Sequence, residues 1–166
     1  GDRPDSGSVT DRARYTFGTV FAAGGLGRIR RAYDHRLQRH VAVKEIHSFR
    51  PGSTSEARFQ REALLTARLE HPAIVPVHDL GSEQAPYFAM KRLTGRTLAE
   101  VLAGKRDGVS ELTERWTWRT LLARLVDVCN AIDLAHDRGV IHRDLKPANI
   151  MLGDFGETYV LDWGLA

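Results

Sequence analysis

Charged and amide side chains are concentrated in residues 140–152, VIHRDLKPANIML. Asp144, Lys146 and Asn149 lie there at fixed offsets, in an expected loop that Pro147 interrupts. So dense a set of charges is unusual for a simple connection between apolar segments. A carboxylate base, a cation and a neutral metal ligand in this arrangement suit the transfer of a phosphoryl group between oxygen atoms.

A lysine in the first third of the chain lies on a predicted strand, HVAVKEI (40–46). Because side chains alternate along a strand, Ala42 and Lys44 share one face, opposite the two valines. The small alanine could leave room for a flat ring, and the lysine could supply a cation for phosphate. A solvent-exposed lysine on a strand face is the alternative.

A glutamate lies on the apolar face of the next predicted helix. Helical spacing places four residues on that face: Phe59, Glu62, Leu65 and Leu69. Burying a carboxylate costs free energy unless the carboxylate is paired, and Lys44 is the candidate partner. A Glu62 side chain that bends out to solvent is the alternative.

Glycines cluster between the first two predicted strands, at Gly24, Gly25 and Gly27. Glycine lets backbone N–H groups approach a ligand closely and point toward phosphate oxygens. A tight turn explains the same residues equally well. The dinucleotide-binding fingerprint is excluded, because a strand and not a helix follows these glycines.

The hydrophobic pattern predicts the elements that must position these residues. Strands are expected at residues 15–21, 28–34, 40–46, 74–80 and 86–91. Helices are expected at residues 51–72, 97–103 and 116–139. Ser53 and Glu56 have capping-box spacing, and residues 104–112 are expected to be a loop. Strands with one helix precede the remaining helices, which favours an α+β fold in two lobes.

The strongest helical pattern is in residues 116–139, where Gly139 is a natural C-cap. Its apolar stripe consists of Leu121, Leu125, Val128, Cys129, Ile132 and Ala135. We expect Cys129, the only cysteine, to be a buried structural thiol. A single cysteine excludes an intrachain disulfide, and this fits a reducing compartment.

Composition excludes several classes of function. The formal net charge of +3, from 24 basic and 21 acidic residues, is too small an excess to indicate nucleic-acid binding. No apolar run approaches the roughly 18 residues of a membrane span. No signal peptide precedes the polar residues 1–14, which resemble a linker. We therefore expect a cytoplasmic piece of a longer protein, which a segment elsewhere could tether to a membrane.

In their order, these motifs resemble those of the protein kinase family, and the bacterial type of Ser/Thr kinase in particular. The resemblance runs from about Tyr15 to Ala166. It implies a flexible lead-in at 1–14, a kinase N-lobe at 15–93 with an antiparallel sheet and one major helix, and at 94–166 the first part of a mainly helical C-lobe. It also implies ATP and Mg²⁺ as cofactors and protein Ser/Thr hydroxyls as acceptors.

The resemblance assigns one group of residues to the ATP site: Phe21, Ala22, Gly24, Gly25, Gly27, Ile29, Ala42, Lys44, Met90, Lys91, Leu93 and Met151. Lys44 would hold the α- and β-phosphates, and Glu62 would anchor Lys44. Met90 would be the gatekeeper, and the backbone of Lys91 and Leu93 would bind adenine.

The resemblance assigns a second group to the phosphoryl transfer itself. Asp144 would orient and deprotonate the acceptor hydroxyl, and Lys146 would stabilise the transferring phosphoryl group. Lys146 also favours Ser/Thr over Tyr as the acceptor. Asn149 would ligate Mg²⁺. Arg143 often pairs in this family with a phosphate on the activation loop, which implies control by phosphorylation.

Two triplets compete for the second metal ligand, Asp154-Phe155-Gly156 and Asp162-Trp163-Gly164. NIML and ETYVL are predicted to be strands joined by the turn GDFG, so the hairpin returns Asp162 to the neighbourhood of Asn149. Asp154 would lie at the far tip, roughly 16 Å away at about 3.3 Å per residue. We therefore expect Asp162 to be the metal ligand, with Asp-Trp-Gly in place of the family's Asp-Phe-Gly.

Several expectations depend on how this chain departs from the family. Ala22 replaces the first glycine of the phosphate loop, Lys91 replaces a common acidic residue, and Trp163 is bulkier than phenylalanine. We expect the 166 residues to stop before the activation segment and the peptide-docking surface. The 166-residue piece is therefore expected to be weakly active or inactive, with part of its 117–138 helix exposed.

Three functions remain open from the sequence. The first is a Ser/Thr protein kinase that acts on protein substrates and self-associates for autophosphorylation. The second is a pseudokinase or a nucleotide-binding regulatory module without catalysis. The third is a small-molecule phosphotransferase, which Lys146 and Pro147 fit less well.

Overall fold

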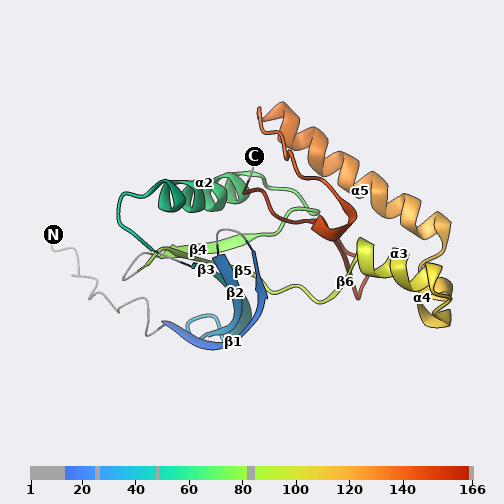
Figure 1. The fold of residues 1–166 in the computed structure, drawn as a ribbon, viewed down its shortest axis with the longest axis horizontal. Coiled ribbons are helices and arrows are strands. Elements are labelled where there is room, and N and C mark those ends of the chain that lie inside the picture. Colours follow the sequence, from blue (N-terminus) through green and yellow to red (C-terminus); the bar gives the residue numbers. More distant parts are fainter. Residues whose placement is uncertain (1–13, 25–26, 48, 82–84, 165–166) are drawn as a thin grey trace, which may run out of the picture. The chain divides into compact units, whose positions relative to one another are not determined.

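The computed structural model describes residues 14–24, 27–47, 49–81 and 85–164 (Figure 1). The chain divides into two compact units, Gly1–Ala57 with His78–Arg92 and Arg58–Val77 with Leu93–Ala166. Each unit is described by itself. A sheet dominates the first unit and helices the second, so the expected α+β class is confirmed. The proposed lobe boundary at 93/94 stays a prediction.

The first unit is built on a five-stranded sheet with the order β1-β2-β3-β5-β4. Its strands are β1 (Tyr15–Ala23), β2 (Gly27–Asp34), β3 (Arg39–Ile46), β4 (Val77–Gly81) and β5 (Tyr87–Lys91). All five predicted strands are present, and β1/β2, β2/β3 and β3/β5 pair antiparallel. β4 begins later than predicted because Pro76 has no N–H for a ladder, and Ile74 makes only an isolated bridge with Val160.

One face of this sheet carries a small apolar core. Its buried members are Tyr15, Ala32, Val41, Val43, Tyr87 and Ala89. The rings of Tyr15 and Tyr87 meet edge to face with centroids 6.1 Å apart. The two valines of β3 therefore face the core, which confirms the predicted alternation around Ala42 and Lys44.

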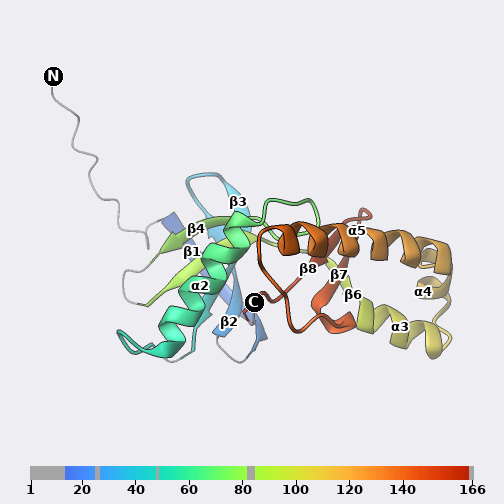
Figure 2. The ribbon, with the colours of Figure 1, turned by 90° about the horizontal axis from the view of Figure 1, so that it is seen from above.

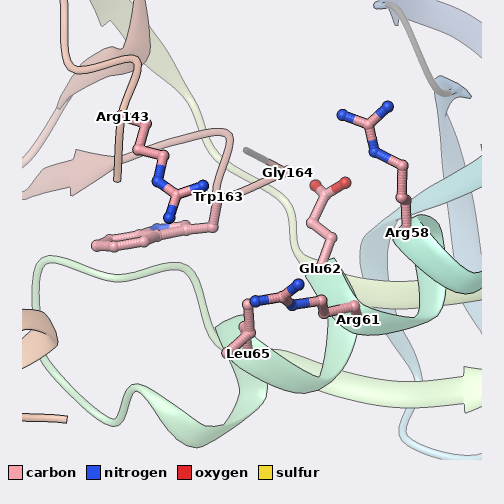
Figure 3. Close-up of a pocket in the computed structure, with 7 residues that line it drawn as sticks. All are labelled: Arg58, Arg61, Glu62, Leu65, Arg143, Trp163 and Gly164. Atoms are coloured by element: carbon pink, nitrogen blue, oxygen red, sulfur yellow. The ribbon is translucent and has the colours of Figure 1, made fainter. Parts of the chain in front are cut away.

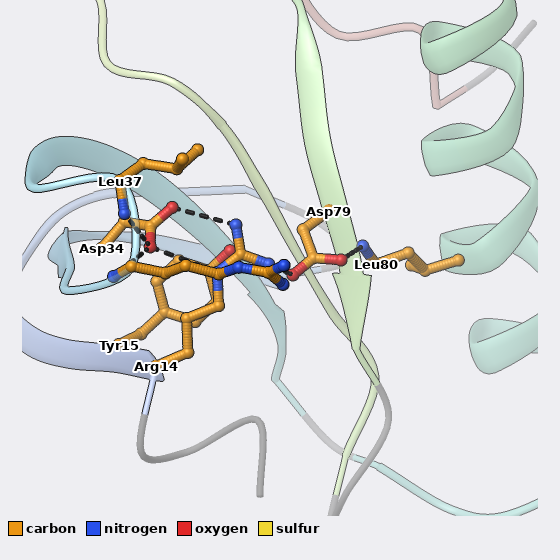
Figure 4. Close-up of polar contacts among 7 residues, drawn as sticks. Arg14, Tyr15, Asp34, Leu37, Asp79 and Leu80 are labelled. Carbon is orange, nitrogen blue, oxygen red and sulfur yellow. Dashed lines mark hydrogen bonds and ion pairs between the residues drawn. The ribbon is translucent and has the colours of Figure 1, made fainter. Parts of the chain in front are cut away.

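A partly buried ionic cluster, which we name the Arg14 cluster, joins Arg14, Tyr15, Asp34 and Asp79 (Figure 4). Arg14 donates to both carboxylate oxygens of Asp34, at 3.2 and 3.0 Å, and to Asp79 at 2.7 Å. The Tyr15 hydroxyl donates to Asp79 at 3.0 Å. Asp34 is fully buried, and the Arg14 guanidinium lowers the pKa of its carboxyl. The cluster ties the start of β1 to the end of β2 and to β4.

Helix α2 (Thr54–Arg68) begins at the predicted capping residues. The Ser53 hydroxyl accepts from the Glu56 N–H at 3.2 Å, and the Glu56 carboxylate accepts from the Gly52 N–H at 2.7 Å. Glu62 lies on the buried face of the helix and is only 5% exposed. The inward orientation predicted for this carboxylate is therefore correct, and the solvent-facing alternative is wrong.

The second unit combines helices with a three-stranded sheet of order β6-β7-β8. Its elements after α2 are β6 (Gly95–Thr97), α3 (Leu98–Arg106), α4 (Ser110–Arg115), α5 (Trp118–Asp137), η1 (Pro147–Asn149), β7 (Ile150–Gly153) and β8 (Thr158–Val160). Helix α5 lies beside the β7–β8 hairpin, where Thr158 donates to Asp127 at 2.9 Å (Figure 2).

Residues 104–112 were expected to be a loop, and this prediction is wrong. Helix α3 continues to Arg106, and α4 begins at Ser110. Leu112 is buried against Gly104, where an added Cβ would come within 2.2 Å of the leucine side chain. This tertiary contact between two adjacent segments stabilises a second short helix that the local sequence does not reveal.

The apolar stripe predicted for α5 is only partly correct. Leu121, Val128 and Ala135 are buried, together with Ala131, which the stripe omitted. Leu125 and Cys129 are exposed, so the prediction of a buried structural thiol is wrong. These two residues lie on the helix surface with exposed Trp118, Leu122 and Val126, beside the face that packs on the hairpin. Part of the helix is thus exposed, as expected.

No helix in the described part of the chain has the length and apolarity that a membrane crossing requires.

Candidate active site

Asp144, Lys146 and Asn149 are brought together in the second unit. Lys146 Nζ donates to both oxygens of Asp144, at 3.0 and 2.7 Å. Asn149 Nδ2 donates to the carbonyl of Asp144 at 2.9 Å and to its carboxylate at 3.0 Å. The hydrogen bond from Lys146 is the main cause of a lowered pKa for Asp144. The carboxylate is therefore held in one orientation and is ionised at neutral pH.

His142 packs beneath the loop of Asp144 as a hydrogen-bonded support that was not among the predicted site residues. It is 3% exposed, and its Nδ1 accepts from the Asp144 N–H at 3.3 Å. Since Nδ1 accepts, Nε2 carries the proton of the neutral ring and donates to the Leu161 carbonyl at 2.8 Å. His142 therefore links the loop of Asp144 to the segment that carries Asp162. The sequence signal for His142 is the His-Arg-Asp triplet that it forms with Arg143 and Asp144.

The β7–β8 hairpin has the predicted geometry. Ile150 pairs with Val160, and the Leu161 N–H donates to the Asn149 carbonyl at 2.8 Å. The chain that leads to Asp162 thus returns beside Asn149. Asp154 lies at the opposite end, in the turn, where its carbonyl accepts from Arg115 at 2.6 Å. The neighbouring Phe155 is 91% exposed.

Two residues of the site have a left-handed backbone. The φ angle is 63° at Arg143 and 62° at Asp162. Residues other than glycine rarely adopt this conformation, and such strain clusters at functional sites. Arg143 directly follows His142, and Asp162 directly follows Leu161, whose carbonyl is bonded to the His142 ring.

Gly164 lies where two carboxylates approach each other. A Cβ built on Gly164 would lie 3.1 Å from Glu62 Oε2 and 3.3 Å from Asp162 Oδ1. The absence of a side chain at this position therefore leaves room for both acidic groups. Helix α2 and the Asp-Trp-Gly segment contribute to the same part of the second unit.

A pocket of about 210 Å³ adjoins these carboxylates (Figure 3). Its lining consists of Arg58, Arg61, Glu62, Leu65, Arg143, Trp163 and Gly164. We name it the arginine pocket. Three guanidinium groups against one carboxylate give it an excess of positive charge, which suits an anionic ligand.

The residues predicted to bind nucleotide are divided between the two units. In the first unit, Lys44 pairs with Ile29 on β2 and with Phe88 on β5, and its ammonium lies 5.9 Å from the centroid of the Phe88 ring. Ala42 pairs with Met90 in the same ladder. Leu93, Met151 and Glu62 belong to the second unit. The pairing of Lys44 with Glu62, and the ATP site that these residues would share, stay predictions.

The glycine-rich segment is partly described. The Gly24 N–H donates to the Gly27 carbonyl at 2.8 Å, and this closes the turn between β1 and β2. An added Cβ on Gly27 would lie 2.3 Å from the Glu45 carbonyl. The close approach of β3 is therefore enough to explain the glycine at this position, without reference to a ligand. Phe21 is half exposed on β1, and Ala22 pairs with Ile29. Gly25 lies outside the described residues.

The donor set fits a magnesium ion bound to a nucleotide. Asn149 uses its Nδ2 toward Asp144, so its Oδ1 is left as an acceptor, and the Asp162 side chain is exposed. Mg²⁺ prefers hard oxygen ligands and usually takes one or two from the protein, with the rest from phosphates and water. No group of three or more His, Cys, Asp or Glu residues within the described ranges could hold a metal alone.

Comparison with known proteins supports the same chemistry. The chain matches the protein kinase domain family over residues 15–166. It is 39% identical over 158 residues to the serine/threonine-protein kinase PknD of Chlamydia pneumoniae, a match that covers 92% of this chain and 17% of the relative. It is 38% identical over 159 residues to the probable serine/threonine-protein kinase SCO3848 of Streptomyces coelicolor. That match covers 92% of this chain and 22% of the relative. The chain thus spans about a fifth of the length of these relatives.

Proposed function

Because this chain belongs to the protein kinase family, we propose that it carries the nucleotide-binding part and the catalytic loop of a Ser/Thr protein kinase. The protein would transfer the γ-phosphoryl group of ATP to Ser or Thr hydroxyls of protein substrates. The observation that carries this proposal is the set of four hydrogen bonds that fixes Asp144 between Lys146 and Asn149. ATP as the phosphoryl donor makes the cytoplasm the expected location.

Each residue has a role in this proposal. Asp144 orients the acceptor hydroxyl and takes its proton, and Lys146 stabilises charge on the phosphoryl group as it moves. Lys44, anchored by Glu62, holds the α- and β-phosphates. Asn149 and Asp162 would hold Mg²⁺, which would supply positive charge to neutralise the phosphates.

A noncatalytic nucleotide-binding module is less well supported. Such a protein would be expected to lack a base, a cation or a metal ligand, and residues 144, 146, 149 and 162 supply all of these groups. The names of the similar proteins also describe kinases.

The test uses the full-length protein with Asp144 replaced. Asp144→Asn should lower the rate of protein phosphorylation by about 100-fold or more, since a positioned base contributes on that order. ATP affinity, measured by calorimetry, should change little. The matched control is Asp154→Asn at the hairpin tip, which should phosphorylate at the wild-type rate. Normal turnover by the Asp144 variant would reject the proposed function.

We also propose that the arginine pocket accepts a phosphorylated residue of the protein's own activation segment. Arg143 follows from the family resemblance, and the structure adds Arg58 and Arg61 from α2. Phosphate geometry matches guanidinium groups well, and a phosphate between them would join α2 to the catalytic loop.

A further inference from the structure

The Asp-Trp-Gly segment contains a hydrogen bond that a phenylalanine could not make. Trp163 is 2% exposed, and its indole Nε1–H donates to the Val160 carbonyl at 3.3 Å. Val160 is the fully buried last residue of β8. The bond therefore closes a tight loop from residue 163 back to the end of the hairpin, with Leu161 and Asp162 inside it.

This loop holds the chain on both sides of Asp162. Before it, the Leu161 carbonyl accepts from His142 at 2.8 Å. After it, the Trp163 ring packs edge to face against the His142 ring, with centroids 4.7 Å apart. Between these attachments Asp162 keeps its left-handed φ of 62°. A residue in this unfavourable conformation persists only where its surroundings determine it.

We propose that the Trp163 indole N–H is a positioning group that fixes the Asp162 carboxylate for the metal–nucleotide complex before the ligand binds. The inference rests on the proposed function, because it takes Asp162 as a magnesium ligand. A phenylalanine ring at position 163 would keep an aromatic ring beside His142 but could not donate a hydrogen bond to the Val160 carbonyl. The segment would then sample more conformations, and binding would have to order it.

The test replaces Trp163 by phenylalanine in the full-length protein. Trp163→Phe should weaken ATP affinity in the presence of Mg²⁺ by about 3- to 10-fold, the range that one hydrogen bond supports. ATP affinity without Mg²⁺ should be unchanged, and backbone amide exchange at residues 161–164 should accelerate. Trp116→Phe is the matched control, because Trp116 is also buried in the second unit but contacts neither Asp162 nor His142 among the described interactions. It should leave all three measurements unchanged.

Two outcomes separate this inference from the proposed function. Wild-type Mg²⁺-dependent affinity and wild-type exchange in the Trp163→Phe variant would overturn the role of the indole N–H. Wild-type Mg²⁺-dependent affinity in an Asp162→Asn variant would instead overturn the metal role of Asp162. If the phenylalanine variant does not fold, Trp163→3-benzothienylalanine removes the N–H at constant shape. The same weakening is then expected, and wild-type affinity would contradict the inference.

Discussion

At the scale of single residues, Asp144 shows how neighbours determine ionisation. The Lys146 hydrogen bond lowers its pKa, so its carboxylate stays ionised as pH falls to values where an isolated aspartate is already protonated. We predict that Lys146→Met raises the pKa of Asp144 toward its ordinary value of about 3.9. Carbon-13 NMR titration of the Asp144 carboxyl measures this directly. Equal midpoints in the two proteins would show that Lys146 does not control the charge.

Gly164 is the residue whose missing side chain matters most to the site. A methyl group at this position would press on Glu62 Oε2 and Asp162 Oδ1, at 3.1 and 3.3 Å. We predict that Gly164→Ala displaces both carboxylates by a few tenths of an ångström and lowers kcat by about 10-fold, because displacements near 1 Å cost about 100-fold. The melting temperature should change little. A normal kcat would mean that the carboxylates can move without consequence.

At the scale of elements, the arginine pocket depends on α2 and the catalytic loop together. Arg58→Gln and Arg61→Gln should each reduce the activation that phosphorylation produces in the full-length protein, by about 10- to 100-fold for each lost charge-assisted contact of about 1.5–3 kcal/mol. Activity of the unphosphorylated protein should be unchanged. Arg68→Gln is the control, since Arg68 lies on the same helix but does not line the pocket. Full activation of both pocket variants would refute an anion site there.

The elements that the sequence predicted well are those with a local cause. The five strands of the first unit follow from apolar alternation, and the hairpin follows from Gly-containing turn residues between two short apolar runs. Helix α4 was missed because contact with Gly104 stabilises it through Leu112. Cys129 was misplaced because helical spacing identifies an apolar surface but does not tell which part of that surface packs.

The same distinction applies to the candidate site. Asp144, Lys146 and Asn149 are close in sequence, so their spacing already indicated that they act together, and the structure brings them into contact. His142 acts through a backbone carbonyl, and Gly164 acts through the space that its missing side chain leaves. The triplets His-Arg-Asp and Asp-Trp-Gly mark both positions in the sequence but do not reveal these contacts. The Lys44–Glu62 pair involves two units and remains a prediction.

At the scale of the whole molecule, the two units have separate apolar cores. The first is centred on Tyr15, Val41 and Val43, and the second on residues such as Ile74, Val128 and Val160. The ionic interactions of the Arg14 cluster belong to the first unit only. Their loss should therefore affect one unit before the other, which gives a way to separate local from global stability.

We predict that Arg14→Met destabilises the first unit by about 3–5 kcal/mol, because it leaves the buried Asp34 carboxylate without its cation. The folded pKa of Asp34 is lowered, so the ionised carboxylate stabilises the fold above its unfolded pKa of about 3.9, and this contribution is lost as pH falls through the lower folded value. Without Arg14, acid unfolding should begin at higher pH.

Hydrogen exchange of the full-length protein distinguishes the two units in this experiment. In the Arg14→Met variant, amides of β1, β2 and β4 should exchange faster, whereas those of α5 and β7 should keep their wild-type rates. Arg106→Met removes an ion pair whose two side chains are 78% and 62% exposed, so it should cost about 0–1 kcal/mol and leave both units unchanged. Uniform acceleration across both units would show that they unfold together, and unchanged exchange would show that the Arg14 cluster contributes little.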